Sequence, residues 1–261
     1  MKSDQISSAI CLAKPLAQTL SSFTALDLDD FKIIHDCAGD LRSHAAGAEL
    51  PAPYGYASPR GRLIVSGSAA AGKFLPDGRR QLLRLLLPGD VVGGLGLRDE
   101  GLVIVALTEL KTVDTGPLYS ALNTPSPAHA ALRAAWGQAQ RAAQRRLVQH
   151  AVRLGRYSAY ERMADFLLEF HDQQHRAGLP NQAAIYLPTQ EVLADFLGLS
   201  IVHVNRTLQQ MRRDRLLVHQ AARVDIPDLA RLMGAAMVEP SICERSRVRG
   251  ASGSIRSLAA Y

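Results

Sequence analysis

The chain has 261 residues, 47% of them hydrophobic, and its 30 Lys and Arg against 24 Asp and Glu give a formal net charge of +6. This length supports one large core or two modest ones, whereas no stretch approaches the roughly 18 uninterrupted apolar residues of a membrane-spanning helix. Cys11, Cys37 and Cys243 are odd in number and widely separated, which excludes a disulfide framework or a paired-cysteine metal site. We therefore expect a cytoplasmic protein with no metal, no cofactor and no membrane partner.

The first half of the chain is predicted to be mainly strand. A helix is expected across Asp27 to Cys37, followed by a proline-containing loop at 51–59. Pro76-Asp77-Gly78 and Pro88-Gly89-Asp90 have turn chemistry, because proline presets φ and glycine adopts positive φ. The strand candidates are Leu63–Val65, Leu82–Leu87, Val103–Val105 and Lys111–Asp114. Several short strands at this spacing predict a small sandwich or barrel.

The segment from Pro127 to His175 is predicted to form two helices with a break near Gly155. Its first helix has one apolar stripe, with spacings of three or four, made of Leu132, Trp136, Ala139, Ala143, Leu147, Ala151 and Leu154. A stripe of about seven turns is longer than one small domain can cover, so we expect it to pair with the same helix of a second copy. The alternative is that the stripe packs wholly on its own β domain.

Basic residues accumulate on the same helix. No acidic residue lies between Asp114 and Glu161, whereas six arginines do: Arg133, Arg141, Arg145, Arg146, Arg153 and Arg156. Such a face attracts polyanions. The alternative is a solvated helix whose carboxylate partners lie elsewhere in the fold, so charge alone indicates nucleic acid without establishing it.

Two short helices joined by a tight turn follow. Thr189 is a helix N-cap, Gly198 ends that helix and Ser200 is the N-cap of the next. The inward positions are Val192, Leu193, Phe196 and Leu197 on the first helix and Val204, Leu208 and Met211 on the second. Small Ala194 lets the helices cross closely, which is typical of a helix-turn-helix. Residues 216–219 and 223–226 are expected to form a hairpin, the wing.

The outward face of the second helix carries the expected DNA contacts. Val202, Arg206 and Gln209 lie on it, flanked by Ile201 and Asn205. Arg206 is the candidate for base readout, since its planar guanidinium can bond both O6 and N7 of guanine; the alternative is a phosphate contact.

Other residues of this region are candidates for contacts with the DNA backbone. They are Thr189, Gln190, Ser200 and His203, and the basic surface extends through Arg212, Arg213 and Arg215. Such contacts fix the position of the protein on DNA without reading sequence.

These residues resemble the Crp/Fnr superfamily of bacterial transcription regulators over roughly residues 15 to 236. The matching segments are Leu75-Pro76-Asp77-Gly78-Arg79-Arg80-Gln81, Leu87-Pro88-Gly89-Asp90, Ala106-Leu107-Thr108, Glu161-Arg162-Met163-Ala164, Leu167-Leu168-Glu169, Thr189-Gln190-Glu191 and Leu199-Ser200 through Leu208. The resemblance implies an α+β chain with an N-terminal double-stranded β-helix sensor domain, similar to cyclic-nucleotide-binding domains, at 15–125. It further implies a dimerisation helix at 126–155 and a C-terminal winged helix-turn-helix at 156–236. Residues 237–261 form a basic tail that we expect to be disordered.

The chain departs from the family pattern where effectors bind. Members that bind cyclic nucleotide have an Arg-Ser or Arg-Thr pair for the phosphate, whereas Glu100-Gly101 stand at that position here. We therefore expect no cyclic AMP binding by the usual contacts. Oxygen-sensing members use four cysteines, more than this chain has, and a haem on His35 or His44 is not expected. The expected partners are double-stranded DNA and a second copy of the chain. A small-molecule effector and RNA polymerase are left open as further partners.

Two other classes of function compete with this hypothesis. An enzyme built on a cupin-like barrel needs a histidine and carboxylate cluster, but no histidine lies between Arg62 and Asp114, so we expect no catalytic residues. A winged helix used for protein contacts, or an effector-independent regulator with a degenerate sensor domain, stays open. The weak strand pattern before Arg62 favours the latter.

Overall fold

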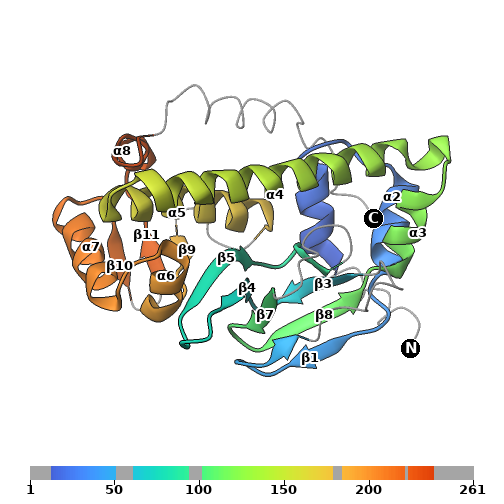
Figure 1. Ribbon diagram of the computed structural model, residues 1–261. Coiled ribbons are helices and arrows are strands. Elements are labelled where there is room, and N and C mark those ends of the chain that lie inside the picture. Colours follow the sequence, from blue (N-terminus) through green and yellow to red (C-terminus); the bar gives the residue numbers. More distant parts are fainter. Residues whose placement is uncertain (1–12, 51–60, 94–101, 179–183, 221–222, 238–261) are drawn as a thin grey trace.

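A computed structural model describes residues 13–50, 61–93, 102–178, 184–220 and 223–237. One long helix, α4 (Ala130–Arg156), extends along the molecule (Figure 1). Two β-sheets lie below one end of α4, and a small bundle of helices with a three-stranded sheet lies at the other end. Within the described ranges no helix is long and apolar enough to cross a membrane.

The two larger sheets form a sandwich. The first has the order β1 (Arg42–His44), β8 (Leu110–Asp114), β3 (Gly61–Ser66) and β6 (Val91–Gly93); the second has β2 (Glu49–Leu50), β7 (Val103–Ala106), β4 (Ala69–Phe74) and β5 (Arg80–Leu86). All neighbouring strands are antiparallel. Buried side chains of both sheets, among them Ile64, Leu86 and Leu110, pack between them. The predicted sandwich and its four strands are confirmed.

Four strands of the sandwich were not predicted: β1, β2, β4 and β6, of which β6 pairs with β3. β4 has the sequence Ala-Ala-Ala-Gly-Lys-Phe, which lacks the β-branched residues typical of strands, and β1 and β2 have only three and two residues. Their strand conformation comes from pairing with β5, β7 and β8. Because β1 and β2 complete the two sheets, the weak strand pattern before Arg62 no longer supports a degenerate sensor domain.

Both predicted turns are present. Gly78 and Gly89 have φ values of 84° and 95°. A Cβ atom on Gly89 would lie 2.9 Å from the Pro15 carbonyl oxygen and 2.9 Å from Thr19 Oγ1. This turn therefore packs directly against the helical residues 13–21, and only glycine permits the approach.

The predicted helices are present with small changes in bounds. α2 (Leu28–Asp36) begins after Asp27, which forms a capping box with Asp30. α3 (Gly116–Asn123) and a 3₁₀ turn, η1 (Pro127–His129), lead into α4. The break between α4 and α5 (Ala159–Arg176) lies at Tyr157 and Ser158, where the Ser158–Glu161 capping box starts α5. Gly155 is inside α4, so the observed break comes two residues after the predicted position.

The apolar stripe of α4 is buried in its first half, whereas other apolar side chains are exposed in the second half of the helix. Leu132 is fully buried, and Trp136 and Ala139 pack beside it against the N-terminal helix and α3. The exposed large apolar side chains of α4 are instead Val148 (67%) and Val152 (40%), which the stripe did not include, although Ala151 of the stripe is exposed between them. The first half of the stripe is therefore covered by its own domain, because α2, α3 and the N-terminal helix add apolar surface there.

The arginines of α4 do not all lie on the surface. Arg153 has 0% exposure and forms ion pairs of 2.7 Å with Asp165 and Glu169 of α5. For this residue the expectation of a polyanion-attracting face is wrong, since its carboxylate partners lie on the neighbouring helix. Arg141, Arg145 and Arg156 are exposed.

The C-terminal part has the order α5, β9 (Ala184–Tyr186), α6 (Gln190–Leu197), α7 (Ile201–Arg213), β10 (Val218–Gln220), β11 (Arg223–Asp225) and α8 (Leu229–Ala235). β10 and β11 form the predicted hairpin, and β9, which was not predicted, pairs with β11. One core joins these elements with Leu82 and Leu85 of β5. The sandwich and the C-terminal part therefore share apolar contacts.

Candidate nucleic-acid interface

The two helices at the C-terminal end begin and end as their sequences predict. Thr189 Oγ1 accepts a hydrogen bond of 3.3 Å from the Val192 amide, and Ser200 Oγ accepts one of 3.2 Å from the His203 amide. Gly198 has a φ of 63°, and a Cβ there would lie 3.1 Å from Leu154 Cδ2. Caps and glycine together fix the angle at which α7 leaves α6.

The inward face of this unit is apolar. Val204, Leu208 and Met211 of α7 are buried, as predicted, and so is Thr207. The three predicted residues pack in one core with the four predicted inward residues of α6, Val192, Leu193, Phe196 and Leu197. Burial of this face fixes which side of α7 is left for a partner.

The outward face of α7 contains the candidate residues. Ile201 and Val202 are 50% and 65% exposed, and His203, Asn205, Arg206 and Gln209 are exposed as well. Asn205 Nδ2 donates a hydrogen bond of 3.2 Å to Oε1 of Gln190, so the structure brings the start of α6 onto the same surface. Within the described part of the chain, Arg206 has no hydrogen bond or ion pair.

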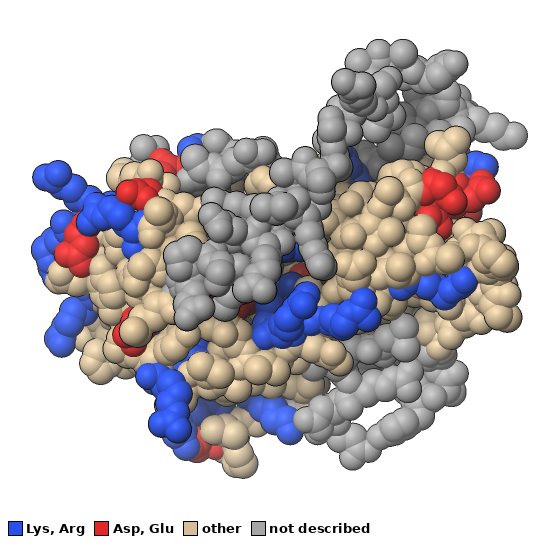
Figure 2. Space-filling view, turned by 90° about the horizontal axis from the view of Figure 1, so that it is seen from above, with Lys and Arg blue, Asp and Glu red and all other residues tan. Residues whose placement is uncertain are grey.

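Further basic residues surround this surface. Arg212, Arg213 and Arg215 are exposed at the end of α7 and just beyond it. Figure 2 shows basic side chains protruding at the end of the molecule where α7 and α8 lie. A helix with an exposed polar and basic face, held by a buried apolar face, fits the major groove of DNA.

Two residues of β5, a strand of the sandwich, form polar contacts with α6. The sequence did not predict these contacts. Arg80 of β5 forms ion pairs with Asp195 and, at 3.0 Å, with Glu191. Gln81 Nε2 donates to the carbonyl oxygens of Asp195 at 3.0 Å and Phe196 at 3.2 Å. Arg80 and Gln81 follow the Pro-Asp-Gly turn in one of the segments that resemble the family, but no local pattern indicates contacts more than a hundred residues away.

A buried polar cluster lies where α4, α5, α6 and β5 meet. The His150 ring stacks on Phe196 with 4.3 Å between centroids, and His150 Nε2 lies 3.2 Å from the Leu82 carbonyl oxygen. Arg153 Nη1 lies 3.3 Å from His150 Nδ1. Burial, together with the charge of Arg153, lowers the pKa of His150 to about 4. The imidazole is therefore neutral at neutral pH.

The residues considered for cofactors are not brought together. His44 Nε2 lies 3.1 Å from Thr112 Oγ1 in the sandwich, whereas His35 is on α2. Burial raises the pKa of the Cys37 thiol to about 11, which leaves it unreactive. No group of three or more His, Cys, Asp or Glu suited to a metal ion occurs among the described residues. Cys11, Cys243, Glu100 and Gly101 lie outside the described residues.

The chain is similar in sequence to known transcription regulators. A family described as Crp-like helix-turn-helix domain matches residues 161–235. The transcriptional activatory protein AadR of Rhodopseudomonas palustris is 32% identical over 160 residues, 59% of this chain and 64% of the relative. The nitrogen fixation regulation protein FixK of Azorhizobium caulinodans is 34% identical over 153 residues, 56% of this chain and 58% of the relative. These two matches span less than two thirds of each relative.

A longer match is to the transcriptional activator protein FnrL of Cereibacter sphaeroides, 30% identical over 181 residues, 66% of this chain and 71% of the relative. Among solved structures, FixK2 from Bradyrhizobium japonicum is 28% identical with a TM-score of 0.60 and covers 75% of this chain and 96% of that one. TTHA1359 from Thermus thermophilus shares the fold, with 19% identity and a TM-score of 0.53 over 76% of this chain and 98% of that one.

Proposed function

Since the chain belongs to the Crp/Fnr family of transcription regulators, we propose that it binds an operator in double-stranded DNA as a homodimer and so regulates transcription. The family is one of regulators and not of enzymes. The observation that carries the proposal is the exposed face of α7. This face is held by buried Val204, Leu208 and Met211 and presents Arg206 without a partner among the described residues.

In this proposal α7 lies in the major groove. Arg206 and Gln209 reach base edges with Asn205, and Ile201 and Val202 contact thymine methyl groups, since their side chains form no hydrogen bonds. Thr189, Gln190, Ser200 and His203 lie near the first turns of α6 and α7, where backbone amides and side chains position phosphates.

The homodimer part of the proposal rests on the C-terminal half of α4. Val148 and Val152 are four residues apart and exposed, and Gly155 follows on the same face with no atom near its Cβ position. An exposed apolar face on a long helix is stabilised by the same face of a second copy. Two copies would present two α7 helices to two half-sites.

The domain organisation that we propose has four parts: a sensor domain at 15–125, a dimerisation helix at 126–155, a DNA-binding domain at 156–236 and a basic tail at 237–261. A small-molecule effector and RNA polymerase stay predicted partners. The expected lack of cyclic AMP binding through the usual contacts also stays a prediction.

The test is to select bound fragments from a random DNA library with the purified full chain. We expect enrichment of one pseudo-palindromic sequence whose half-sites are about one helical turn, roughly 10 base pairs, apart. Fluorescence anisotropy then compares the selected operator with a scrambled sequence of equal length at one salt concentration. Absence of any enriched sequence, or equal affinity for both fragments, would contradict the proposal.

A further inference from the structure

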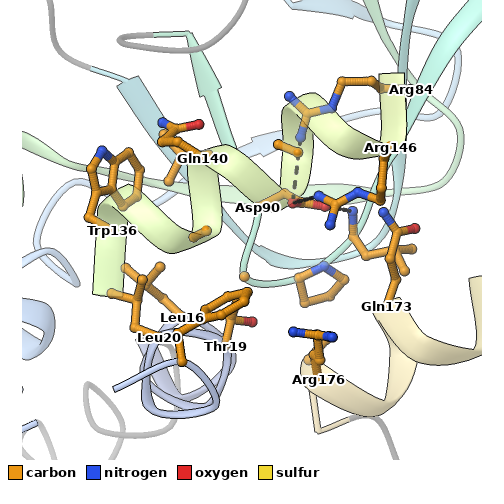
Figure 3. A pocket seen from close by; sticks show the side chains of 18 residues that line it. Leu16, Thr19, Leu20, Arg84, Asp90, Trp136, Gln140, Arg146, Gln173 and Arg176 are labelled. Atoms are coloured by element: carbon orange, nitrogen blue, oxygen red, sulfur yellow. Dashed lines mark hydrogen bonds and ion pairs between the residues drawn. The ribbon is translucent and has the colours of Figure 1, made fainter. Parts of the chain in front are cut away.

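A pocket lies outside the sandwich, where four elements meet. It is lined by the helical residues 13–21, the turn between β5 and β6, α4 and the end of α5 (Figure 3). Its free volume of ≈ 70 Å³ is several times that needed by one water molecule. None of the DNA-facing residues of α7 lines it.

One side of the pocket has positive charges that are only partly neutralised. Arg84 and Arg146 line it with a single carboxylate, Asp90, which leaves an excess of one positive charge, whereas Arg176, which also lines it, is paired at 2.9 Å with Asp172. Asp90 Oδ1 lies 3.7 Å from Arg84 and 3.9 Å from Arg146, beyond hydrogen-bond distance, and Asp90 Oδ2 accepts from the Leu87 amide. Among the described residues the two guanidinium groups have no closer polar partner.

Burial of the Arg84 guanidinium is energetically unfavourable when no anion is bound beside it. The Arg84 side chain is only 11% exposed, and burial lowers the pKa of its guanidinium. Asp90 opposes this shift, Arg146 adds to it, and the more weakly acting Glu169 opposes it. A buried cation is normally paired and hydrogen-bonded, so this side of the pocket favours a bound oxyanion.

The opposite side of the pocket is apolar. Figure 3 shows Leu16, Leu20 and Trp136 lying across from the three arginines. Phe23 also lines the pocket, with the Arg176 guanidinium 5.1 Å from its ring centroid. Apolar walls beside convergent cationic donors are typical of sites for small molecules with a charged group and an apolar body.

We propose that this pocket binds a small organic anion, with its carboxylate or phosphate between Arg84 and Arg146 and a short aromatic or apolar body against Trp136. Because α5 lies at the start of the matched helix-turn-helix segment, the bound anion fixes that segment relative to α4 and the β5–β6 turn. The claim that the bound anion changes operator affinity rests on the proposed function. The claim that the pocket binds the anion does not.

The chain contains its own reporter for the test, since Trp136 is its one tryptophan. Fluorescence of the full chain, in the absence of DNA, is titrated with phenyl phosphate and benzoate, and with inorganic phosphate and benzyl alcohol as probes of the separate parts. We expect saturable changes with the two aromatic anions, weaker binding of inorganic phosphate and none of benzyl alcohol. Isothermal calorimetry provides an independent affinity.

Variants then locate the site. Arg146→Gln removes a charge-assisted hydrogen bond and should weaken binding of the aromatic anions about tenfold or more. Arg156→Gln, an exposed arginine of the same helix that does not line the pocket, should leave the affinity unchanged. Arg84→Gln is a second test on β5 if Arg146→Gln does not fold.

The outcomes separate the two proposals. Binding of neither aromatic anion, equally tight binding of inorganic phosphate, or undiminished affinity in both Arg146→Gln and Arg84→Gln overturns the pocket. A chain that binds the anion but no operator contradicts only the proposed function. Anion binding that leaves operator affinity unchanged overturns the effector role.

Discussion

Arg206 lies in the second turn of α7, exposed and opposite the buried apolar face. If it bonds guanine, Arg206→Ala should weaken binding to the selected operator by roughly 1 to 3 kcal/mol per half-site, with a much smaller effect on random DNA. Competition binding at fixed salt measures both affinities. Equal weakening on operator and random DNA would assign Arg206 to phosphate and leave base readout to Ile201, Val202, Asn205 or Gln209.

Arg212 provides the matched control because it is an exposed arginine at the last turn of the same helix. If it binds phosphate, Arg212→Ala should weaken specific and nonspecific binding alike. The slope of log affinity against log salt should become shallower by about one for each phosphate that the variant leaves unneutralised in each half-site. An unchanged slope would show that Arg212 does not touch the DNA backbone.

His150 makes the stability of the protein depend on pH. Its folded-state pKa of about 4 lies below the ordinary value of 6.5, so between these values the unfolded chain binds a proton that the folded chain does not. The contribution of His150 is complete above pH 6.5 and is lost as pH falls toward 4, by about 3 kcal/mol. Urea unfolding across this range measures it, and His150→Gln should flatten the pH dependence. The same dependence in both proteins would refute this account.

At the scale of elements, the docking of α6 on β5 was decided by tertiary structure. Arg80 and Gln81 stand beside a turn that the sequence predicts well, but their partners Asp195 and Phe196 belong to a helix far along the chain. Pairs so distant in sequence come together only when the sandwich and the helix-turn-helix pack against each other. Local patterns predict the two elements and not the interaction between them.

α4 is the element on which the assembly of the protein depends. In the proposed dimer Val148 and Val152 become buried, so Val148→Glu would bury an unpaired charge at a cost of about 3–5 kcal/mol. Sedimentation should give twice 28.2 kDa for the natural chain and a lower average mass for the variant. Val218→Glu, a change at another exposed valine, should leave the mass unchanged. A natural chain that is monomeric at micromolar concentration would contradict the dimer.

In the whole molecule, three sets of contacts join the sandwich to the C-terminal helices. They are the Arg80 ion pairs, the buried cluster of His150 with Arg153, and the pocket with Arg84 and Arg146. All three involve β5 or the turn after it, and two involve α5 directly. If the proposed anion acts on operator affinity, these packed elements are the contacts that connect its pocket with α6.

Local sequence patterns specify those elements whose physical cause lies within a few residues. Caps at Thr189 and Ser200, the left-handed glycine at 198 and the apolar spacing of α7 specify the helix-turn-helix, because each acts within a few residues. Tertiary structure alone decided that Ala-rich β4 is a strand, that Arg153 is buried and that Arg84 and Arg146 share one carboxylate. Each of these depends on residues far apart in the chain, whose proximity no local propensity or periodicity encodes.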